Sequence, residues 1–376
     1  MSEEAVKKII LKEDEDYIVN MGPQHPSTHG VLRMEVCLNG ETVKYMIPHI
    51  GYIHRGMEKM AESNTYKQII HLTDRMDYLS AHINNEAVCL AVENALGVEV
   101  PERVQYIRAI LDELTRIASH HLWWSAFGMD LGALTTFFYG MRDREKILAI
   151  FEESFGSRLL HSFNTPGGLM HDVHPDFRKH TLEFVKYFRK KLPDYKNLLT
   201  DNVIFHNRTI GIGVMDKEMA VNYGVTGPSG RGSGFSCDIR KTAPYGIYDK
   251  VEFNEILYSE GDSFARYKVR MDEMEESLNI LEQLVENMPE EGGFTAKMKP
   301  VVKLPEGEYF QRVEAARGEF AVFIVSKGEK YPYRIKFRSP NFSNLFVLSQ
   351  LAIGGIIADL VAITGSLDLV IPDIDR

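Results

Sequence analysis

The stretch PERVQYIRAILDELTRIASHHLWWSAFGMD, residues 101–130, decides the expected fold. Pro101 suits the first turn of a helix, where the N–H that proline lacks would have no partner. After it, apolar residues recur every three or four positions, which is the spacing of one face of an α-helix. The residues on this face are Val104, Ile107, Ile110, Leu111, Leu114, Ile117 and Ala118. The stretch therefore predicts a long helix with one apolar face.

The same periodicity extends on both sides of this helix, from about Met57 to Met288. Further helices are expected over residues 79–96, 175–192 and 262–288, the last one capped by Asp262 or Ser263. Amphipathic helices of this kind bury their apolar faces against one another. The middle of the chain is thus expected to be a helix bundle.

β-Hairpins are expected near both ends of the chain. Residues 31–47 alternate apolar and polar side chains around Asn39-Gly40, a dipeptide typical of a two-residue turn. Residues 320–325 and 333–337 flank Ser-Lys-Gly-Glu-Lys in the same way. The segment 22–30, Gly-Pro-Gln-His-Pro-Ser-Thr-His-Gly, contains two prolines and two glycines and is therefore expected to be a shaped loop.

These elements predict an α+β fold that is mainly α, with a central long-helix bundle, an N-terminal β-hairpin and C-terminal β segments. We expect one integrated domain with four parts. They are a flexible N-terminus (1–17), a loop and β-hairpin region (18–50), a helical bundle core (51–305), and a C-terminal β-hairpin with a buried helix and tail (306–376).

Composition and charge exclude several classes of protein. The 376 residues carry a formal charge of −10, whereas binding to nucleic acid needs clustered Lys and Arg. Cys37, Cys89 and Cys237 are far apart and form no CxxC, which argues against a disulfide framework or a cysteine-rich metal centre and favours a reducing compartment. The first residues lack the apolar core of a signal peptide and are too acidic for a transit peptide.

Residues 345–367, LFVLSQLAIGGIIADLVAITGSL, are long enough to span a hydrocarbon layer of about 30 Å. An intramembrane Asp359 would be costly, and Gly354-Gly355 lies in the middle. We therefore expect a helix buried in a protein core, with membrane contact made through partners.

His25 and His29 have the H-x-x-x-H spacing that on a helix would suit zinc. Pro26 between them and the missing Glu of HExxH defeat that interpretation. Two interpretations remain open. Both histidines hydrogen-bond backbone groups in a loop, or His29 acts as a proton donor, since its ordinary pKa of about 6.5 lies near neutrality.

Tyr78 and Asp130 are the other candidates. The residues Asp74-Arg-Met-Asp-Tyr78 precede an apolar helix, so the carboxylates are consistent with plain capping. The Tyr78 phenol differs, because it can donate a hydrogen bond to a carbonyl oxygen yet stays neutral until about pH 10. Asp130 follows an aromatic-rich helix, where a carboxylate needs a partner such as Arg or His, and it could orient a histidine.

The glycine-rich segment 227–234 lacks the GK[ST] of a phosphate loop and the frame of a dinucleotide site, so it predicts a tight backbone crossing. His120-His121, His171 and His174 complete no ligand set and are expected to be structural or exposed.

Several motifs follow one another in the order of a known family. They are MGPQHPSTHGVLR, HRGMEK, DRMDY, NTPGG, VTGPSGRGSG, DIRKTAPY, ARYKVRMDEM and GSLDLVIPDIDR. From about Tyr17 to Arg376 the chain resembles the 49-kDa subunit of respiratory complex I, which in bacteria is the D subunit of NADH–quinone oxidoreductase. That family in turn resembles the large subunit of nickel–iron hydrogenases, which implies a fold of that kind.

The hydrogenase metal motif R-x-C-x-x-C is replaced here by Arg75-Met-Asp77-Tyr-Leu-Ser80, and the tail has no cysteine. The resemblance therefore implies that this chain holds no metal and no cofactor of its own. It implies instead a quinone-headgroup site in the vacated cavity, next to a 4Fe-4S cluster ligated by a neighbouring subunit.

Residue by residue, His29 and Tyr78 match the side chains that hydrogen-bond the quinone carbonyls in the family. Asp130 matches the acid paired with that histidine. Arg55 and His161 match residues near the terminal cluster, where positive or titrating groups act electrostatically rather than as ligands.

The implied function is quinone reduction within a proton-translocating NADH–quinone oxidoreductase, with no activity expected from the chain alone. The implied partners are the B subunit, which holds the iron–sulfur cluster, the C and I subunits, and the membrane-embedded H subunit. The implied place is the cytoplasmic face of a bacterial cell membrane, as a peripheral protein. The rival interpretations are a non-catalytic scaffold and a hydrogenase-type large subunit of a related membrane-bound redox complex.

Overall fold

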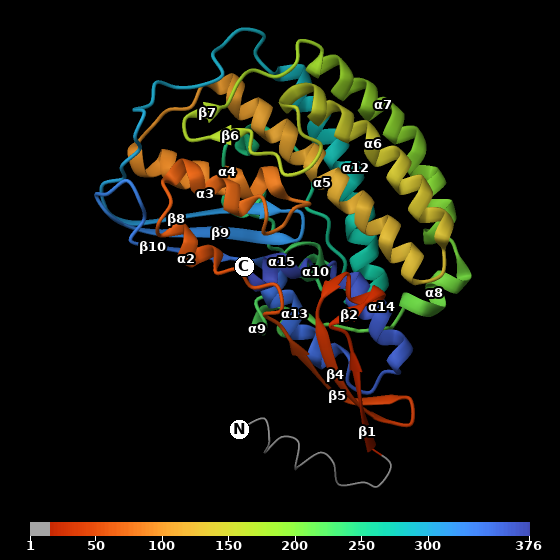
Figure 1. The fold of residues 1–376 in the computed structure, drawn as a ribbon. Coiled ribbons are helices and arrows are strands. Elements are labelled where there is room, and N and C mark those ends of the chain that lie inside the picture. Colours follow the sequence, from red (N-terminus) through yellow and green to blue (C-terminus); the bar gives the residue numbers. More distant parts are fainter. Residues whose placement is uncertain (1–15) are drawn as a thin grey trace.

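The computed structural model describes residues 16–376 and is drawn in Figure 1. It is 51% helix and 16% strand, which confirms the predicted α+β, mainly α fold.

The α-helices are α2 (Met57–Ala61), α3 (Tyr66–Thr73), α4 (Ala81–Leu96), α5 (Glu102–Asp130), α6 (Leu134–Phe155), α7 (Phe177–Tyr195), α8 (Val203–Thr209), α9 (Lys217–Asn222), α10 (Gly227–Arg231), α11 (Ile239–Thr242), α12 (Ser263–Asn287), α13 (Pro340–Leu351), α14 (Ile357–Leu367) and α15 (Ile371–Asp375). Short helical turns are η1 (Pro26–Thr28), η2 (Lys196–Thr200) and η3 (Tyr248–Lys250). The strands are β1 (Asp16–Met21), β2 (Gln24–His25), β3 (Gly30–Val31), β4 (Arg33–Asn39), β5 (Thr42–His49), β6 (Asn164–Thr165), β7 (Gly168–Leu169), β8 (Glu306–Ala315), β9 (Gly318–Lys327) and β10 (Arg334–Arg338).

Four long helices, α5, α6, α7 and α12, form the predicted bundle. Helix α5 packs against α6 and α12, and α7 packs against the same two helices on the other side. The predicted apolar face of α5 is buried throughout, and Pro101 is the residue that precedes its first turn rather than a member of it.

The other predicted helices appear as α4, α7 and α12, with ends shifted by three residues or fewer. The predicted cap of α12 is confirmed, because the Asp262 carboxylate accepts a hydrogen bond from the N–H of Ala265 at 2.7 Å. Helix α6 was not singled out from the sequence. Its first turns expose Leu134, Phe138 and Tyr139 to solvent, and these exposed apolar residues obscure the 3.6-residue period.

The N-terminal hairpin is part of a three-stranded antiparallel sheet in the order β1-β4-β5. Asn39 pairs with Thr42, so the two turn residues are Gly40 and Glu41, one position later than predicted. Asp16 and Tyr17 already belong to β1, so the prediction of a flexible segment is wrong for these two residues. The rest of that prediction, residues 1–15, lies outside the described part of the chain.

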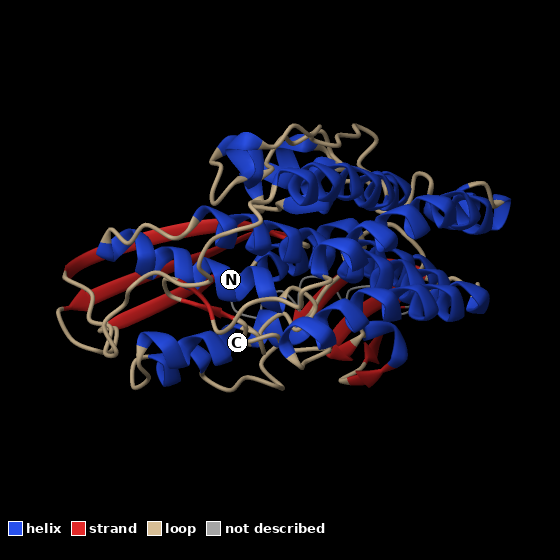
Figure 2. Ribbon diagram, turned by 90° about the horizontal axis from the view of Figure 1, so that it is seen from above, coloured by secondary structure: helices blue, strands red, loops and turns tan. Residues whose placement is uncertain are grey.

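The C-terminal sheet has the order β10-β9-β8, and the predicted hairpin is its β9–β10 pair. Strand β8 was not expected because its first half is largely exposed and carries charged residues. Helix α4 packs against β8 and β9, which places this sheet beside the bundle. Figure 2 shows the strands gathered in two separate places among the helices.

The predicted single helix over 345–367 is wrong, because the chain forms α13 and α14 with a break between them. Gly354 adopts a left-handed conformation (φ 81°), which favours glycine. Its N–H donates to the carbonyl of Val43, and the carbonyl of Gly355 accepts from the N–H of Val43, so the break pairs with strand β5. No helix within residues 16–376 is long and apolar enough to cross a membrane.

The core has two parts. One buries the bundle against the C-terminal sheet, and the other buries β4 and β5 against α13, α14 and the C-terminal tail. The first described strands and the last helices therefore share one hydrophobic core.

The glycine-rich segment makes the predicted tight crossing. Gly227 is left-handed (φ 68°), and a Cβ atom there would lie 2.4 Å from the carbonyl oxygen of Arg317. Only glycine allows the backbone of α10 to approach the β8–β9 turn so closely. The crossing also delivers the buried Arg231 to Glu314, at 2.7 Å, and to Glu273.

Candidate functional site

His29 and Asp130 are brought together although they lie 101 residues apart in sequence. The Nε2 atom of His29 is 2.6 Å from the Oδ2 atom of Asp130. Asp130 is the last residue of α5, and 9% of its side-chain surface is exposed, against 33% for His29. Asp130 thus has the histidine partner that its apolar surroundings required, and His29 remains accessible from outside.

The loop holds His29 in position through its own backbone. His29 ends the turn η1 in the left-handed region (φ 51°), which a non-glycine residue adopts only where its surroundings demand it. The hydroxyl of the preceding Thr28 lies 2.7 Å from the carbonyl oxygen of His25. A Cβ atom on the following Gly30 would lie 2.7 Å from the side chain of Ile371, so the loop packs tightly on the C-terminal tail.

Helix α14 closes the other side of this pair. A Cβ atom on Gly365 would lie 2.8 Å from the ring of Phe127 and 3.7 Å from Oδ2 of Asp130. The indole N–H of Trp123 donates to the Gly365 carbonyl at 2.7 Å. The absence of a side chain at Gly365 therefore lets α14 lie directly against the end of α5.

The pKa of His29 is raised above its ordinary value. The main cause is the hydrogen bond to Asp130, with further contributions from the charges of Asp130 and Asp368, while burial acts in the opposite direction. The imidazolium form of His29 is therefore more stable than that of a free histidine.

The carboxylate of Asp77, next to Tyr78, is not mainly a helix cap. Asp77 accepts from the N–H of Leu79 at 3.0 Å, but it also forms a buried ion pair with Arg317 at 3.0 Å. The other end of the same guanidinium binds Asp368 at 2.9 Å. The capping interpretation is thus incomplete, because this acid belongs to a buried Asp77–Arg317–Asp368 cluster.

Tyr78 is half-buried and directly follows Asp77 of this cluster in the sequence. Within residues 16–376 its hydroxyl has no hydrogen-bond partner, so it is free to donate to a ligand. Burial raises the pKa of the phenol, which keeps it protonated at all physiological pH values. The charge of Asp368 contributes to the raised pKa of both Tyr78 and His29.

Arg55 is exposed and is tied to the segment before α4. Its guanidinium donates to the carbonyl of Arg75 at 3.0 Å, and Arg75 pairs with Asp74 at 2.8 Å. Asp74 in turn accepts from the hydroxyl of Ser162, the neighbour of His161. The two residues expected near a cluster are therefore linked through one chain of contacts.

His161 is buried between the rings of Phe151 and Phe155, with ring centroids 4.5 Å and 5.2 Å away. Neither ring nitrogen has a hydrogen-bond partner among the described residues. Burial lowers the pKa of His161 to about 3, so in this chain by itself the imidazole is neutral. Buried ring nitrogens usually have a hydrogen-bond partner, so the His161 ring is exceptional among the described histidines in this part of the fold.

Three other histidines have structural contacts. The N–H of Ser27 donates to the Nδ1 atom of His25, which fits the backbone-bonding interpretation for that residue. His120 is buried and lies 2.9 Å from Glu273, and His121 packs among aromatic rings. The structural interpretation of these two residues is confirmed.

Comparisons with known proteins identify the family. A protein-family model described as "Respiratory-chain NADH dehydrogenase, 49 Kd subunit" matches residues 130–303 and 294–376. A Desulfotalea psychrophila protein, named as the D subunit of NADH-quinone oxidoreductase, is 48% identical over 368 residues, covering 98% of this chain and 99% of that protein. The chain belongs to this 49-kDa family.

Two further proteins are similar to this chain over nearly its whole length. A Bacteroides fragilis protein, named as the combined C/D subunit of NADH-quinone oxidoreductase, is 54% identical over 367 residues, covering 98% of this chain and 69% of that protein. A chain in the solved structure of the membrane-bound sulfane sulfur reductase, an archaeal respiratory membrane complex, has a TM-score of 0.93 at 36% identity. That match covers 97% of this chain and 100% of the other.

This member of the 49-kDa family offers poor thiolate ligands. Cys37, Cys89 and Cys237 lie on β4, on α4 and before α11, and burial raises the pKa of each thiol, in Cys237 to about 12. Metal binding by cysteine requires the thiolate form. Within the motif Arg75-Met-Asp77-Tyr-Leu-Ser80, the carboxylate of Asp77 is engaged by Arg317.

Sequence reasoning missed Arg317 and Asp368 as members of the site. Arg317 lies in the two-residue turn between β8 and β9, and Asp368 ends α14 in a left-handed conformation. The signal in the sequence was a charged residue in a tight turn of small residues, Ala315-Ala-Arg-Gly318, and an aspartate in the quoted C-terminal motif. Neither reveals its partner, because Arg317 and Asp77 are 240 residues apart.

Proposed function

We propose that this chain forms the quinone-reduction site of a proton-translocating NADH–quinone oxidoreductase, together with the subunit that holds the last iron–sulfur cluster. The observation that carries the proposal is the 2.6 Å pair of His29 and Asp130, with the free hydroxyl of Tyr78 influenced by the charge of Asp368, as His29 is. An accessible, acid-oriented histidine and an unpartnered phenol are two donors suited to the two carbonyl oxygens of a quinone.

The chemistry follows from the protonation states. Reduction of a quinone to a quinol takes up two electrons and two protons. His29 donates a hydrogen bond, and then a proton, to one oxygen, and Asp130 stabilises the imidazolium form beforehand because it raises the pKa of His29. Tyr78 donates a hydrogen bond to the other oxygen and remains a neutral phenol, and the second proton is taken from water.

Electrons reach the quinone from a 4Fe-4S cluster of the neighbouring subunit. Arg55 contributes a fixed positive charge near that cluster, and the unpartnered ring of His161 contributes an N–H donor. Positive charge and N–H donors near a cluster raise its reduction potential. These two residues therefore tune the electron donor without ligating it.

The proposed partners are the B subunit with its iron–sulfur cluster, the C and I subunits, and the membrane-embedded H subunit. Fusion of the C and D subunits in the Bacteroides fragilis relative supports contact between this chain and a C subunit. We place the chain at the cytoplasmic face of the membrane, attached through these partners. Movement of the loop that carries His29 couples quinone chemistry to proton translocation in the membrane part of the complex.

The test is reduction of a quinone-headgroup analogue by membranes that carry the assembled complex. His29→Ala and Tyr78→Phe are compared with wild type and with two matched controls. His171→Ala changes an exposed histidine outside the loop, and Tyr333→Phe changes an exposed tyrosine. Loss of one general acid typically costs about 10²–10⁴ in rate.

We expect His29→Ala to lose most of the activity and Tyr78→Phe to turn over more slowly with a weaker apparent affinity for the quinone. The controls keep wild-type rates. Unchanged quinone reduction in both variants, with assembly verified, would make this chain a scaffold that merely positions the cluster-bearing subunit.

A second candidate function rests on the archaeal relative. The membrane-bound sulfane sulfur reductase chain shares 36% identity and nearly the whole fold with this chain. Reduction of a sulfane-sulfur compound such as a polysulfide, in place of quinone, is therefore the rival activity. Assays of the same membranes with both acceptors separate them, since the proposal requires the quinone to be the faster one.

A further inference from the structure

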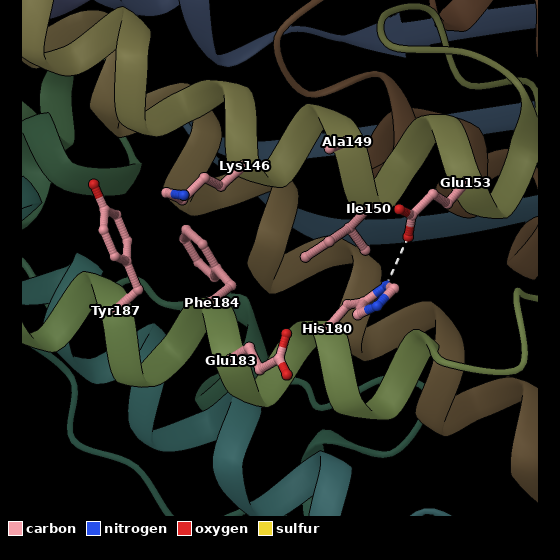
Figure 3. Close-up of a pocket in the computed structure, with 8 residues that line it drawn as sticks. All are labelled: Lys146, Ala149, Ile150, Glu153, His180, Glu183, Phe184 and Tyr187. Carbon is pink, nitrogen blue, oxygen red and sulfur yellow. Dashed lines mark hydrogen bonds and ion pairs between the residues drawn. The ribbon is translucent and has the colours of Figure 1, made fainter.

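Three potential metal ligands meet on the surface where α6 ends and α7 begins. Glu153 lies in the last turn of α6, His180 in the first turns of α7, and His174 in the loop that leads into α7. Figure 3 shows Glu153 and His180 facing each other at one end of a groove between the two helices. This cluster has no part in the proposed quinone site.

The three side chains already lie close to one another. The Nδ1 atom of His180 is 2.7 Å from the Oε2 atom of Glu153. The rings of His174 and His180 stack with centroids 6.0 Å apart and an angle of 12° between their planes. One ligand atom from each of the three residues lies within 4.8 Å of the others.

The cluster is open to solvent and to the groove. The exposed fractions of the side chains are 39% for His174, 27% for His180 and 44% for Glu153, so an ion can enter without unfolding. The groove has a volume of about 250 Å³. Lys146 also lines the groove, and its ammonium lies 4.4 Å from the centre of the Tyr187 ring, at the far end in Figure 3.

We propose that Glu153, His174 and His180 bind a zinc ion, whose fourth position faces the groove between α6 and α7. Two imidazoles and one carboxylate are a ligand set that zinc accepts, with the remaining position open to water or a small anion. Magnesium and calcium prefer sites made of oxygen atoms only and fit this set poorly. The negative charge of the chain, −10 overall, also favours a cation.

Only small side-chain movements are needed. Zinc–ligand bonds of about 2.0–2.2 Å require ligand atoms roughly 3.3 Å apart. The contact between Glu153 and His180 opens slightly, and His174 moves inward from a separation of at most 4.8 Å. All three side chains are partly exposed and free to rotate.

Asp176 supplies the outer contact that a ligating histidine usually has. Its backbone N–H donates to the Nδ1 atom of His174 at 3.2 Å, and its carboxylate lies 4.0 Å from the same nitrogen. Zinc at the Nε2 atom of His174 would put a proton on Nδ1, so the contact with the backbone N–H would be replaced by a hydrogen bond to the Asp176 carboxylate. That hydrogen bond would then fix the ring.

A second cluster, His82, Glu86 and Asp112, does not compete for the metal. It is fully buried, and His82 already pairs with Asp112 at 2.7 Å. Burial raises the pKa of Asp112 to about 7 and that of Glu86 well above its usual value. Both acids therefore hold protons that a metal would have to displace.

Zinc binding would add a link between the loop 170–176 and helices α6 and α7, beside the Glu153–His180 contact and the ion pair of Asp172 with Arg103. The loop 170–176 connects β7 to α7. A bound metal would fix this loop to α6. We expect lower proteolysis and slower hydrogen exchange in residues 170–176 when zinc is present.

The experiment measures binding of Zn²⁺ to the purified full chain by titration calorimetry, with Co²⁺ absorption as a second readout. Wild type is compared with His180→Gln, His174→Gln and Glu153→Gln. The matched control is His171→Gln, an exposed histidine of the same loop. Circular dichroism verifies that each variant is folded, and Mg²⁺ serves as the ion that should not bind.

We expect one zinc ion per chain, at least about tenfold weaker binding in each of the three ligand variants, and unchanged binding in the control. The proposal is overturned if wild type binds no zinc, or if the three variants bind it as tightly as wild type.

Discussion

At the scale of single residues, the proposed role of His29 depends on two features. They are a carboxylate that raises its pKa and a backbone conformation that orients its ring. The 2.6 Å contact with Asp130 provides the first, and the left-handed conformation at φ 51° provides the second. The sequence predicted that Asp130 needed a partner, because a carboxylate among aromatic residues is rarely left alone. Which histidine would serve could not be read from spacing, since the chain has 13 of them.

We predict that Asp130→Asn moves the pH profile of quinone reduction to lower pH. Asparagine keeps the shape and a hydrogen-bond acceptor but removes the charge, so the pKa of His29 falls. Because the raised pKa keeps His29 protonated to higher pH, its loss removes the proton donor first on the alkaline side. A fall of one pKa unit lowers the protonated fraction about tenfold above the pKa.

The measurement is the pH–rate profile of assembled complex with a quinone-headgroup analogue. Asp249→Asn, which changes an exposed aspartate far from the loop in sequence, is the matched control and should leave the profile unchanged. A profile for Asp130→Asn that coincides with wild type would separate Asp130 from the proton donor.

At the scale of elements, the site is set by two close backbone approaches. Gly365 lets α14 lie against the end of α5, and Gly227 lets α10 lie against the β8–β9 turn that carries Arg317. The sequence predicted the second approach from its run of glycines. It did not predict that the turn would deliver a guanidinium to Asp77 and Asp368, because that requires knowing which strand lies opposite.

We predict that Gly227→Ala destabilises the chain and slows quinone reduction. A Cβ atom would lie 2.4 Å from the carbonyl oxygen of Arg317, at a backbone φ of 68°. Overpacking of this kind costs about 1–3 kcal/mol. The left-handed conformation adds about 1–2 kcal/mol for a residue with a Cβ atom.

Urea unfolding of the full chain measures the loss. Gly40→Ala is the matched control, because Gly40 is also left-handed (φ 58°) but has no atom within 4 Å of an added Cβ. The difference between the two variants isolates the clash with the β8–β9 turn. If both variants were destabilised equally, the predicted clash at Gly227 would be absent.

At the scale of the whole molecule, the two ends of the chain stabilise each other. Strands β4 and β5 share a core with α13, α14 and the tail. The carboxylate of Asp375 accepts from the N–H groups of Gly51 at 2.8 Å and Ile53 at 2.9 Å. The loop that carries Arg55 is therefore held by the C-terminal tail.

We predict that Asp375→Asn loosens this loop and lowers the free energy of unfolding. One of the two acceptor oxygens becomes an NH₂ donor facing a backbone N–H, and an unsatisfied buried group costs about 1–3 kcal/mol. Hydrogen exchange at Gly51 and Ile53 should become faster. In the control Asp194→Asn, which alters an exposed ion pair with Lys191, the change should stay below about 1 kcal/mol. Unchanged protection of both amides in Asp375→Asn would contradict the prediction.

The sequence by itself determined the local elements. The 3.6-residue period predicted α5, α4, α7 and α12, and alternation around turn residues predicted both hairpins. These features depend on neighbours within one or two helical turns, so a short window of the sequence is enough to predict them. Signals failed where solvent-exposed apolar residues interrupted the period, as in α6, and where a glycine pair ended a helix that hydropathy continued, as at Gly354.

Only the tertiary structure decided the pairings that make the candidate site. His29 meets Asp130 across 101 residues, Arg317 meets Asp77 across 240, and Glu153 meets His180 across 27. The resemblance to a family suggested roles for His29, Tyr78 and Asp130, but the partners Arg317 and Asp368 emerged from packing. A contact between distant residues depends on how all the intervening elements fill space together, and no local pattern records that arrangement.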